Sequence, residues 1–308
     1  MKKIILSPII LLVLLIAGCD TESPLDMDLF PPKVYIVDAV NTIVDRDLDI
    51  GNETDTISIS VAVGGSRPLS QNVDVQVAED PLAIGIYNTR ELSAEVTHYQ
   101  KLASSIYSYP SEQVTIHAGE VYNTFPILIQ PATLHVDSLY MIPLKLTGTS
   151  AFELNKEDTV ALVRINMVNK YSGLYYMDAV IRNTTNPNDT LVYQMVRNLQ
   201  ATDNGNTVRM YHYNNEFSQG DFIDYRPSHA FKITANADNS LSFSTWDQFK
   251  IIDGGGVYLP ELKLYDFWYT FDDNGVIKKT EGYLYKERKT SEEQRIIDDW
   301  LEDKRKGR

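Results

Sequence analysis

Leu262-Lys-Leu-Tyr-Asp-Phe-Trp-Tyr-Thr-Phe271 is followed by Asp272-Asp-Asn-Gly275 and then by Val276-Ile-Lys-Lys-Thr-Glu-Gly-Tyr-Leu-Tyr285. Both long segments are rich in aromatic and β-branched residues and alternate with period two, which predicts β-strands. The Asn-Gly pair between them predicts a type I′ turn, whose two central residues both need φ > 0. The stretch therefore predicts an antiparallel hairpin and places the chain in the all-β class.

Similar segments precede this hairpin and predict a domain over residues 168–308. They are aromatic-rich and separated by polar turns, at residues 173–181, 190–196, 207–213, 230–234 and 240–246. Successive antiparallel strands of this kind favour a meander that curves into a barrel-like sheet, similar to lipocalins and calycins. Residues 291–302 predict a short C-terminal helix with Ser291 as its N-cap, because four apolar residues there share one face.

The first half of the chain predicts a different β architecture over residues 34–167. Its short segments with period-two alternation lie at residues 34–37, 56–63, 73–77, 114–116, 124–129, 140–146 and 159–166. About seven such strands separated by turn residues favour an immunoglobulin-like β-sandwich. Residues 89–104 predict one short helix between two of these strands.

The N-terminus carries a positive pair, Lys2 and Lys3, and an apolar run that is too short to span a bilayer. The run ends in Leu15-Ile-Ala-Gly-Cys19, which resembles a bacterial lipobox. The resemblance implies that residues 1–18 are a signal peptide and that Cys19 is lipidated. Residues 19–33 then form a polar tether that contains prolines.

Charge and cysteine content restrict the function further. The formal net charge of −14 argues against nucleic-acid binding and against electrostatic docking on anionic lipid. We therefore expect the lipid on Cys19 to be the membrane attachment. Since Cys19 is the single cysteine, no disulfide or thiolate site is expected. The acidic residues of the tether resemble the export signal of Bacteroides-type lipoproteins, which favours the cell-surface face of the outer membrane over the periplasmic face.

Two pairs of motifs carry a family resemblance. Tyr107-Ser-Tyr-Pro-Ser-Glu-Gln-Val-Thr-Ile-His-Ala-Gly-Glu120 and Tyr140-Met-Ile-Pro-Leu-Lys-Leu146 resemble a domain of unknown function in Bacteroides-type lipoproteins. Asn169-Lys-Tyr-Ser-Gly-Leu-Tyr175 and the segment 265–271 resemble the companion C-terminal domain. The resemblance implies a surface accessory protein of a glycan-utilisation system, encoded beside an outer-membrane importer, with a glycan as its expected ligand.

The aromatic residues of the second half are the candidate ligand-binding residues. Flat rings stack on the apolar faces of sugars, and neighbouring polar groups bond the hydroxyls. We predict this role for Trp246, Tyr258, Tyr265, Trp268 and Tyr269. Trp268, flanked by polar residues, is expected to be the exposed ring of its strand. The alternative is that these rings only fill a barrel interior, as most buried aromatics do.

Other motifs have simpler interpretations. Asp253-Gly-Gly-Gly256 lacks the setting of a phosphate loop and is interpreted as a connection between strands. Asp45-Arg-Asp-Leu-Asp-Ile-Gly51 resembles a calcium loop, but its glycine comes one position late, so we interpret it as a polar loop. His212 is predicted at the surface, and the histidines show no zinc spacing. We expect no metal and no cofactor.

The leading hypothesis is a lipid-anchored surface protein that binds a polysaccharide or an oligosaccharide without catalysis. The second hypothesis is a structural or protein–protein interaction module of an outer-membrane complex, such as an importer. A glycoside hydrolase ranks last, because no pair of carboxylates stands out among the 42 acidic residues. No catalytic residue is predicted.

Overall fold

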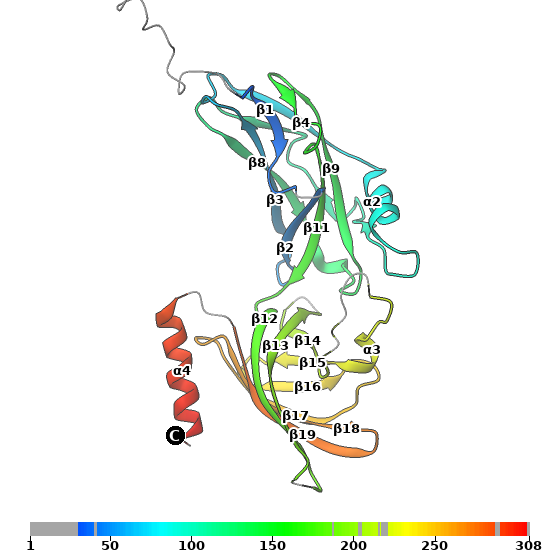
Figure 1. The fold of residues 1–308 in the computed structure, drawn as a ribbon, viewed down its shortest axis with the longest axis vertical. Helices are drawn as coiled ribbons and strands as arrows, with labels where there is room; N and C mark the ends of the chain where they lie inside the picture. The colour runs from blue at the N-terminus through cyan, green and yellow to red at the C-terminus, as the bar shows by residue number, and fades with distance from the viewer. Residues whose placement is uncertain are drawn as a thin grey trace, which may run out of the picture.

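The computed structural model describes residues 30–39, 42–186, 188–202, 205–214, 216, 221–286 and 290–306 (Figure 1). The fold is all-β, as predicted, and consists of a two-sheet sandwich followed by a strongly curved eight-stranded sheet. The predicted signal peptide, most of the tether and Cys19 lie outside the described residues. Within the described residues, no helix combines the length and the apolar character needed to cross a membrane.

The sandwich consists of two sheets whose strands come from residues 33–168. The first sheet has the order β10 (Glu153–Leu154), β1 (Lys33–Ile36), β3 (Asp55–Gly64), β8 (Tyr122–Ile129) and β6 (Tyr107–Ser108). The second has the order β2 (Ile43–Asp49), β11 (Val160–Val168), β9 (Tyr140–Thr149), β4 (Val73–Glu79) and β7 (Gln113–Ile116), and β5 (Gln100–Lys101) also pairs with β9.

Alternation along the strands builds the core between these sheets. In β3 the residues Ile57, Ile59 and Val61 are buried, while their polar neighbours are half-buried or exposed. The facing residues are also aliphatic and β-branched, for example Val75 and Val163, which are fully buried. Such side chains suit a pleated, buried surface, so the period-two pattern predicts these strands correctly.

The N-terminal strand divides between the two sheets. β1 pairs antiparallel with β3, whereas β2 pairs parallel with β11. Asp38 and Thr42, which flank the change of sheet, have φ of 65° and 68°, in the left-handed region. The polar-loop interpretation of residues 45–51 is wrong for most of its length, because β2 continues to Asp49 and Leu48 enters the core.

The helix expected at residues 89–104 is also displaced. The observed helix, α2 (Ala83–Glu91), begins six residues earlier, and the chain after it passes through a turn before it forms β5. A short 3-10 turn, η2 (Pro131–Thr133), precedes β9. α2 lies on the outer face of the second sheet, where Ile84 packs with Met141 and Leu162 (Figure 1). Apolar residues on the outer face of β9 and β11 therefore hold the helix in place.

The second half forms one antiparallel sheet that nearly closes into a barrel. Its order is β16 (Leu241–Thr245), β15 (Ala230–Ala235), β14 (Thr207–Tyr211), β13 (Thr190–Ala201), β12 (Gly173–Asn183), β19 (Val276–Lys286), β18 (Leu264–Asp273) and β17 (Ile251–Leu259). A bridge between Ser240 and Val257 brings the two ends of the order together. The barrel-like prediction is therefore confirmed.

The glycine run 254–256 is part of strand β17, so the loop interpretation of residues 253–256 is wrong. A Cβ at Gly254 would lie 2.7 Å from a side-chain carbon of Phe243 on β16. A Cβ at Gly256, whose φ is +147°, would lie 2.1 Å from the carbonyl oxygen of Asp266. The glycines therefore allow β17 to approach both neighbouring strands and close the barrel.

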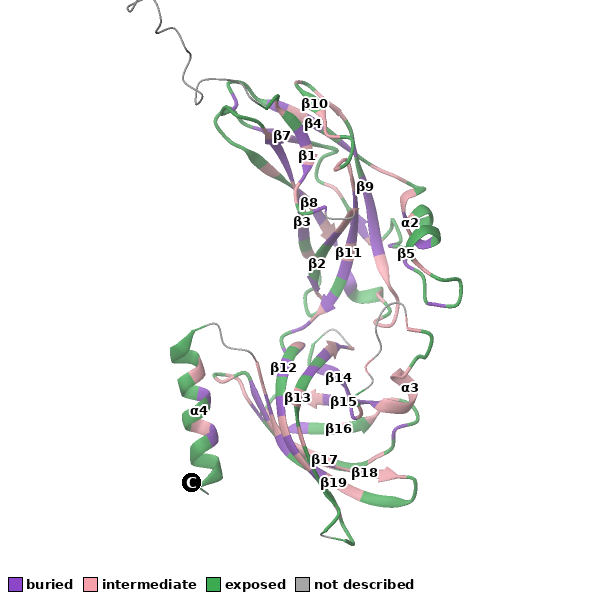
Figure 2. Ribbon diagram, in the orientation of Figure 1, coloured by how far each residue is buried: buried purple, intermediate pink, exposed green. Residues whose placement is uncertain are grey.

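Aromatic side chains fill the barrel. Tyr265, Phe267, Tyr269 and Phe271 of β18 belong to the barrel core and are at most 2% exposed, which confirms the predicted alternation. Figure 2 shows the buried parts of the strands in purple. The predicted hairpin is also confirmed: β18 and β19 join through Asn274 and Gly275, whose φ values are 54° and 88°.

Two helices complete the second half. α3 (Arg226–His229) precedes β15. α4 (Ser291–Arg305) confirms the predicted C-terminal helix, although its N-cap is Thr290 and not Ser291. The Thr290 hydroxyl accepts from the Glu293 N–H, and the Glu293 carboxylate accepts from the Thr290 N–H, which is a capping box. Ile297 and Leu301 bury one face of α4 against Leu264 of the barrel.

A polar contact joins the sandwich to the barrel. The loop before β9 contains Asp137, whose carboxylate accepts from Arg209 on β14 and lies 3.1 Å from a guanidinium nitrogen of Arg226 on α3. The Gln200 side-chain amide also donates to the Val136 carbonyl at 3.4 Å. Because the Arg209 side chain is only 1% exposed, its charge depends on Asp137 for compensation.

Candidate functional site

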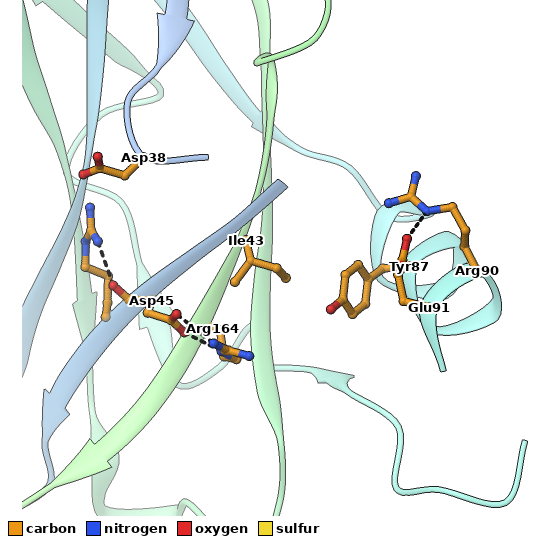
Figure 3. A pocket seen from close by; sticks show the side chains of 8 residues that line it. Asp38, Ile43, Asp45, Tyr87, Arg90, Glu91 and Arg164 are labelled. Atoms are coloured by element: carbon orange, nitrogen blue, oxygen red, sulfur yellow. Dashed lines mark hydrogen bonds and ion pairs between the residues drawn. The ribbon is translucent and has the colours of Figure 1, made fainter. Parts of the chain in front are cut away.

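A cavity of about 730 Å³ lies on the outer face of the second sheet, beside helix α2 (Figure 3). Strands β2 and β11 form its floor, and α2 forms one wall. Its lining residues are Asp38, Ile43, Asp45, Arg46, Tyr87, Arg90, Glu91 and Arg164. We call this cavity the α2 pocket. Arg164 also lines a second hollow, of about 510 Å³, which extends toward the barrel.

Strand alternation and register produce the floor of the α2 pocket. On β2, Val44 and Leu48 turn into the sandwich core, so Ile43 and Asp45 face outward. On β11, alternation likewise sends Val163 inward and Arg164 outward. The parallel register pairs Arg164 directly with Asp45. Two opposite charges are therefore brought together from positions 119 residues apart in the chain.

The Arg164 guanidinium is held in a defined orientation. Its Nη2 donates to Asp45 Oδ2 at 2.7 Å, and its Nε donates to the other oxygen of the same carboxylate. Its Nη1 donates to the Tyr99 hydroxyl at 3.2 Å. The hydrogen bonds to Asp45 raise the pKa of Arg164 further above its usual range. A bidentate pair of this kind fixes the plane of the guanidinium and keeps the remaining N–H groups pointed at fixed positions.

An aromatic ring faces these polar groups from α2. Tyr87 contacts Tyr99 edge to face, with ring centroids 5.9 Å apart, and is half-buried. Burial raises the pKa of the Tyr87 hydroxyl, so it stays neutral and can both donate and accept a hydrogen bond. Arg90 and Glu91, at the end of the helix, form an ion pair at 2.5 Å (Figure 3).

The charges of the α2 pocket balance. Its lining residues include three arginines and three carboxylates. Arg46, which completes the set, donates through Nε to the Ser58 carbonyl on β3 at 2.6 Å and through Nη1 to the Asp45 carbonyl at 2.7 Å. The pocket therefore offers many donors and acceptors but no net field. This combination suits an uncharged ligand with several hydroxyl groups better than an anion or a cation.

Two of the three carboxylates that line the pocket pair with arginines. Asp45 is bound by Arg164 through both oxygens, and Glu91 is bound by Arg90. A glycosidase needs one carboxylic acid that carries a proton to the leaving group, in an environment that favours the neutral form. An arginine partner favours the ionised form instead. The pocket is therefore built for hydrogen bonding more than for proton transfer.

Three of the five predicted ligand-binding residues lie inside the barrel. Tyr258, Tyr265 and Tyr269 are 2%, 1% and 1% exposed. The Tyr265 hydroxyl donates to the Tyr171 carbonyl at 3.0 Å, and Tyr258 packs edge to face on the Tyr171 ring. Their burial agrees with the alternative that these rings fill the barrel interior.

The other two predicted residues are half-buried and lie apart from each other. The Trp246 ring packs under the guanidinium of Arg209, whose Cζ is 4.7 Å from the ring centroid. Trp268 faces outward from β18, and Lys279 Nζ lies 5.1 Å from the centroid of its ring. None of the five residues lines the α2 pocket. Ligand binding by any of them stays a prediction.

The histidine predicted at the surface is buried instead. His212 is 3% exposed, and its Nδ1 forms a 2.7 Å hydrogen bond with the Tyr269 hydroxyl. Its ring stacks on Phe249. Burial, with a smaller effect of the charge of Arg197, lowers the pKa of His212 to about 3. His212 is therefore a neutral part of the aromatic core. In the part of the chain that the structure describes, no group of three or more potential ligands could hold a metal ion.

The residues of the α2 pocket were missed by the sequence analysis for an identifiable reason. Asp45 and Arg46 lie in a segment that was interpreted as a loop, because its polar residues hide the alternation of Val44 and Leu48. A signal was nonetheless present in β11. Arg164 is the one charged residue of the largely apolar strand β11, and a charge at such a position indicates a partner on a neighbouring strand.

Comparison with known proteins identifies both halves of the chain. Residues 30–153 match a family model for an N-terminal domain, and residues 159–285 match a family model for a C-terminal domain. Among curated proteins, none matches this sequence.

Several solved structures share the fold. A Bacteroides ovatus protein of unknown function is 20% identical, with a TM-score of 0.57 over 82% of this chain and 93% of its own. A multidomain B. ovatus protein that includes a domain of unknown function is 19% identical, with a TM-score of 0.56 and the same coverage. A Bacteroides thetaiotaomicron protein described as an auxiliary nutrient binding protein is 16% identical, with a TM-score of 0.54 over 79% of this chain and 90% of its own. At these identities the likeness concerns the fold alone.

Proposed function

The chain belongs to the two-domain family whose N-terminal and C-terminal models it matches, and on this premise we propose that it binds a saccharide without catalysis. The family is one of unknown function and of the glycan-utilisation type in Bacteroides. The α2 pocket carries the proposal. It combines an accessible tyrosine ring with arginine and carboxylate groups whose geometry is fixed by their mutual bonds. Sugars are recognised by this combination of stacking and multiple hydrogen bonds.

The proposed ligand is a neutral oligosaccharide or a segment of a neutral polysaccharide. The balance of three arginines and three carboxylates supports this choice over an acidic glycan. The pocket volume of about 730 Å³ is in the range of ordinary small-molecule sites. The nutrient-binding description of the B. thetaiotaomicron protein with the same fold is consistent with a binding role.

The proposed cellular setting rests on the N-terminal sequence. The lipobox-like segment that ends at Cys19 supports a lipid anchor in the outer membrane, and the acidic tether supports the cell-surface face. In that position the α2 pocket would meet glycans before they enter the cell, and an outer-membrane importer is the proposed partner. Globomycin, which blocks cleavage of lipoprotein signals, should leave residues 1–18 attached, and a Cys19→Ala variant should do the same.

The test of the function is binding of purified full-length chain, in detergent, to an array of neutral and acidic oligosaccharides, followed by titration calorimetry with each positive compound. We expect neutral compounds to bind. Arg164→Gln should weaken their binding at least tenfold, because it removes the guanidinium that Asp45 orients. Tyr87→Ala should weaken it as well.

Arg295→Gln is the matched control, because it breaks an ion pair on the exposed face of α4, far from the pocket in the chain. It should bind as the unchanged protein does. An array with no positive compound, or unchanged affinity in Arg164→Gln, would contradict the proposed site. Release of shorter saccharides from any bound compound, detected by chromatography, would contradict the non-catalytic role.

A further inference from the structure

A second aromatic surface lies on the outside of the barrel, in a different half of the molecule from the α2 pocket. Tyr176 of β12 and Tyr285 of β19 are direct cross-strand partners. Their ring centroids are 5.7 Å apart, and the ring planes are inclined by 33°. Both rings line a hollow of about 470 Å³ together with Asp178, Gln194 and Val196. We call these five residues the barrel platform.

The register of the sheet explains why these residues meet. On β12, alternation sends Tyr175 and Met177 into the core and turns Tyr176 and Asp178 outward. Strand β13 lies next to β12, with Val196 opposite Tyr176 and Gln194 opposite Asp178. The surface therefore consists of an apolar row, Tyr285–Tyr176–Val196, beside a polar row that contains Asp178 and Gln194.

Two members of the apolar row are exposed, and the third, Tyr285, is half-buried because it also packs against the cluster that Ile297 and Leu301 of α4 form. The inward-facing tyrosines are almost fully buried, whereas Tyr176 is 37% exposed and Val196 is 45% exposed. Leu174, one row further along β12, is 51% exposed. The stacking surface thus extends beyond the two rings along the strand, which suits a linear saccharide of several units better than a single sugar.

The polar row supplies complementary groups at one side of the rings. A carboxylate accepts from sugar hydroxyls, and a glutamine amide both donates and accepts. Arg305, in the last turn of α4, brings its Nη2 to 3.5 Å from Asp178 Oδ2. The guanidinium offsets the charge of the carboxylate, so the platform, like the α2 pocket, presents hydrogen-bonding groups without a strong net charge.

We propose that the barrel platform is a second saccharide-binding site, which takes a linear neutral oligosaccharide by stacking on Tyr176 and Tyr285 and by hydrogen bonds to Asp178 and Gln194. The proposal rests on the proposed function, because it assigns the same ligand class to a second region. With one site in each half, the chain contacts a polysaccharide at two points. Linked sites of this kind bind a polymer more tightly than either site alone.

The test uses full-length chain in detergent and linear neutral hexasaccharides built from glucose, mannose or xylose as probes. Titration calorimetry of the unchanged protein should give two sites per chain for the hexasaccharide that binds. The double variant Tyr176→Ala/Tyr285→Ala should retain one site, and Arg164→Gln should retain the other. In gels that contain the corresponding polysaccharide, each variant should lose at least tenfold in apparent affinity.

Tyr122→Ala is the matched control, because Tyr122 is an exposed tyrosine, at 55%, on strand β8 of the sandwich. It should keep both sites. Single variants Tyr176→Ala and Tyr285→Phe, checked by thermal melting, separate loss of stacking from loss of fold. Tyr285→Phe should keep the site, because it retains the ring.

The outcomes separate the two proposals. One site that is lost in Arg164→Gln and unchanged in the double tyrosine variant would overturn the barrel platform and leave the α2 pocket standing. One site with the reverse sensitivity would support the platform and overturn the pocket. No binding to any probe would overturn both. If the protein sediments as a dimer that the tyrosine variant dissociates without a change in saccharide binding, the platform is a contact between copies, and the proposal is wrong.

Discussion

The cores of the sandwich and the barrel are filled in different ways. Between the flat sheets of the sandwich, the buried residues are mostly valine, isoleucine and leucine. Inside the barrel they are largely tyrosine and phenylalanine. Packed sheets leave a layer about 10 Å thick that branched aliphatic chains fill, whereas a closed sheet encloses a wider interior that needs larger side chains. The high aromatic content of the second half therefore follows from the shape of this core.

The two regions also differ in how many polar side chains they bury. Of the described polar side chains that are buried, Asn88 is the one in the sandwich, and the rest, including Arg197, Arg209 and His212, come from residue 169 onward. The Tyr175 and Tyr265 hydroxyls both donate to the Tyr171 carbonyl, at 2.9 and 3.0 Å. Most of these buried groups are bonded within the barrel, whereas Arg209 pairs with Asp137 of the sandwich. In the sandwich the polar groups remain at the surface, where a ligand can use them.

The largest expected effect concerns the closure of the barrel. A Cβ at Gly282 of β19 would lie 2.3 Å from the Asp178 carbonyl oxygen and 2.5 Å from the Ala179 Cβ on the adjacent strand. Gly282→Ala should therefore force β12 and β19 apart and lower the free energy of unfolding of the barrel by about 3 kcal/mol or more. Calorimetry should show a lowered barrel transition beside a sandwich transition at its original temperature.

Gly85→Ala is the control for this substitution. Gly85 lies inside α2, and a Cβ there would meet no atom within 4 Å. Alanine should stabilise the helix by about 0.5–1 kcal/mol, because it restricts the unfolded chain more than glycine does. If Gly282→Ala instead melts both halves in one step, the two regions form a single cooperative unit, and the contrast drawn between them does not extend to their stability.

Local patterns predicted the strands well and the contacts between distant strands poorly. Period-two alternation found β3, β18 and β19, and the Asn274–Gly275 pair found their turn, because these features depend on neighbours in the chain. Strand β2 was missed because its pairing partner, β11, follows more than a hundred residues later. A pattern of neighbouring residues cannot show that the polar residues of β2 pair with so distant a strand. The glycine strand β17 was missed for another reason: its partner β18 follows directly, but glycine has no side chain that could show alternation.

The α2 pocket could not be predicted by motif, because three separated segments build it. Asp45 comes from β2, Tyr87 from α2 and Arg164 from β11. Each is ordinary in its own segment, and only the parallel register of β2 and β11 brings the charges together. In the barrel, alternation predicted two faces of β18 correctly. Tyr265 and Tyr269, two of the predicted ligand-binding residues, lie on the inward face of this strand.

The second-largest expected effect is a loss of stability of the barrel in acid. The folded pKa of His212, about 3, lies below its unfolded value of 6.5, so the unfolded chain binds the proton first. The stability that neutral His212 contributes is complete above about pH 6.5 and decreases as the pH falls toward 3. Between pH 7 and pH 4.5 the barrel should lose about 2–3 kcal/mol, measured by urea unfolding.

Two variants test the assignment to this residue. His212→Phe retains a ring stacked on Phe249 and should remove most of the loss between pH 7 and pH 4.5. At pH 7 it should cost about 1 kcal/mol, because the Tyr269 hydroxyl loses its partner. His98→Gln, at an exposed histidine, should leave the pH profile as it was. An unchanged profile in His212→Phe would assign the acid response to other groups.

The smallest expected effect is a loss of stability of the sandwich, and it occurs at a lower pH than the loss in the barrel. The Glu79 carboxylate accepts hydrogen bonds from the hydroxyls of Tyr107 and Tyr109, at 2.5 and 2.9 Å, and from Lys101 at 2.5 Å. Burial raises the pKa of Glu79, but these bonds outweigh it, so the pKa is lowered from its usual 4.5. Its contribution is therefore complete above about pH 4.5 and is lost as the pH falls through the lowered value.

Glu79→Gln should lower the free energy of unfolding of the sandwich by about 2 kcal/mol at pH 7, since three donors lose a charged acceptor. The difference from the unchanged protein should shrink as the pH falls below 4.5, because Glu79 is protonated first in the unfolded chain and, below its lowered pKa, in the folded protein as well. Glu157→Gln, at an exposed position, should have no effect at either pH. If Glu79→Gln were to shift the barrel transition instead, the carboxylate would act across the two regions, and the sandwich could not be treated as the more acid-resistant half by itself.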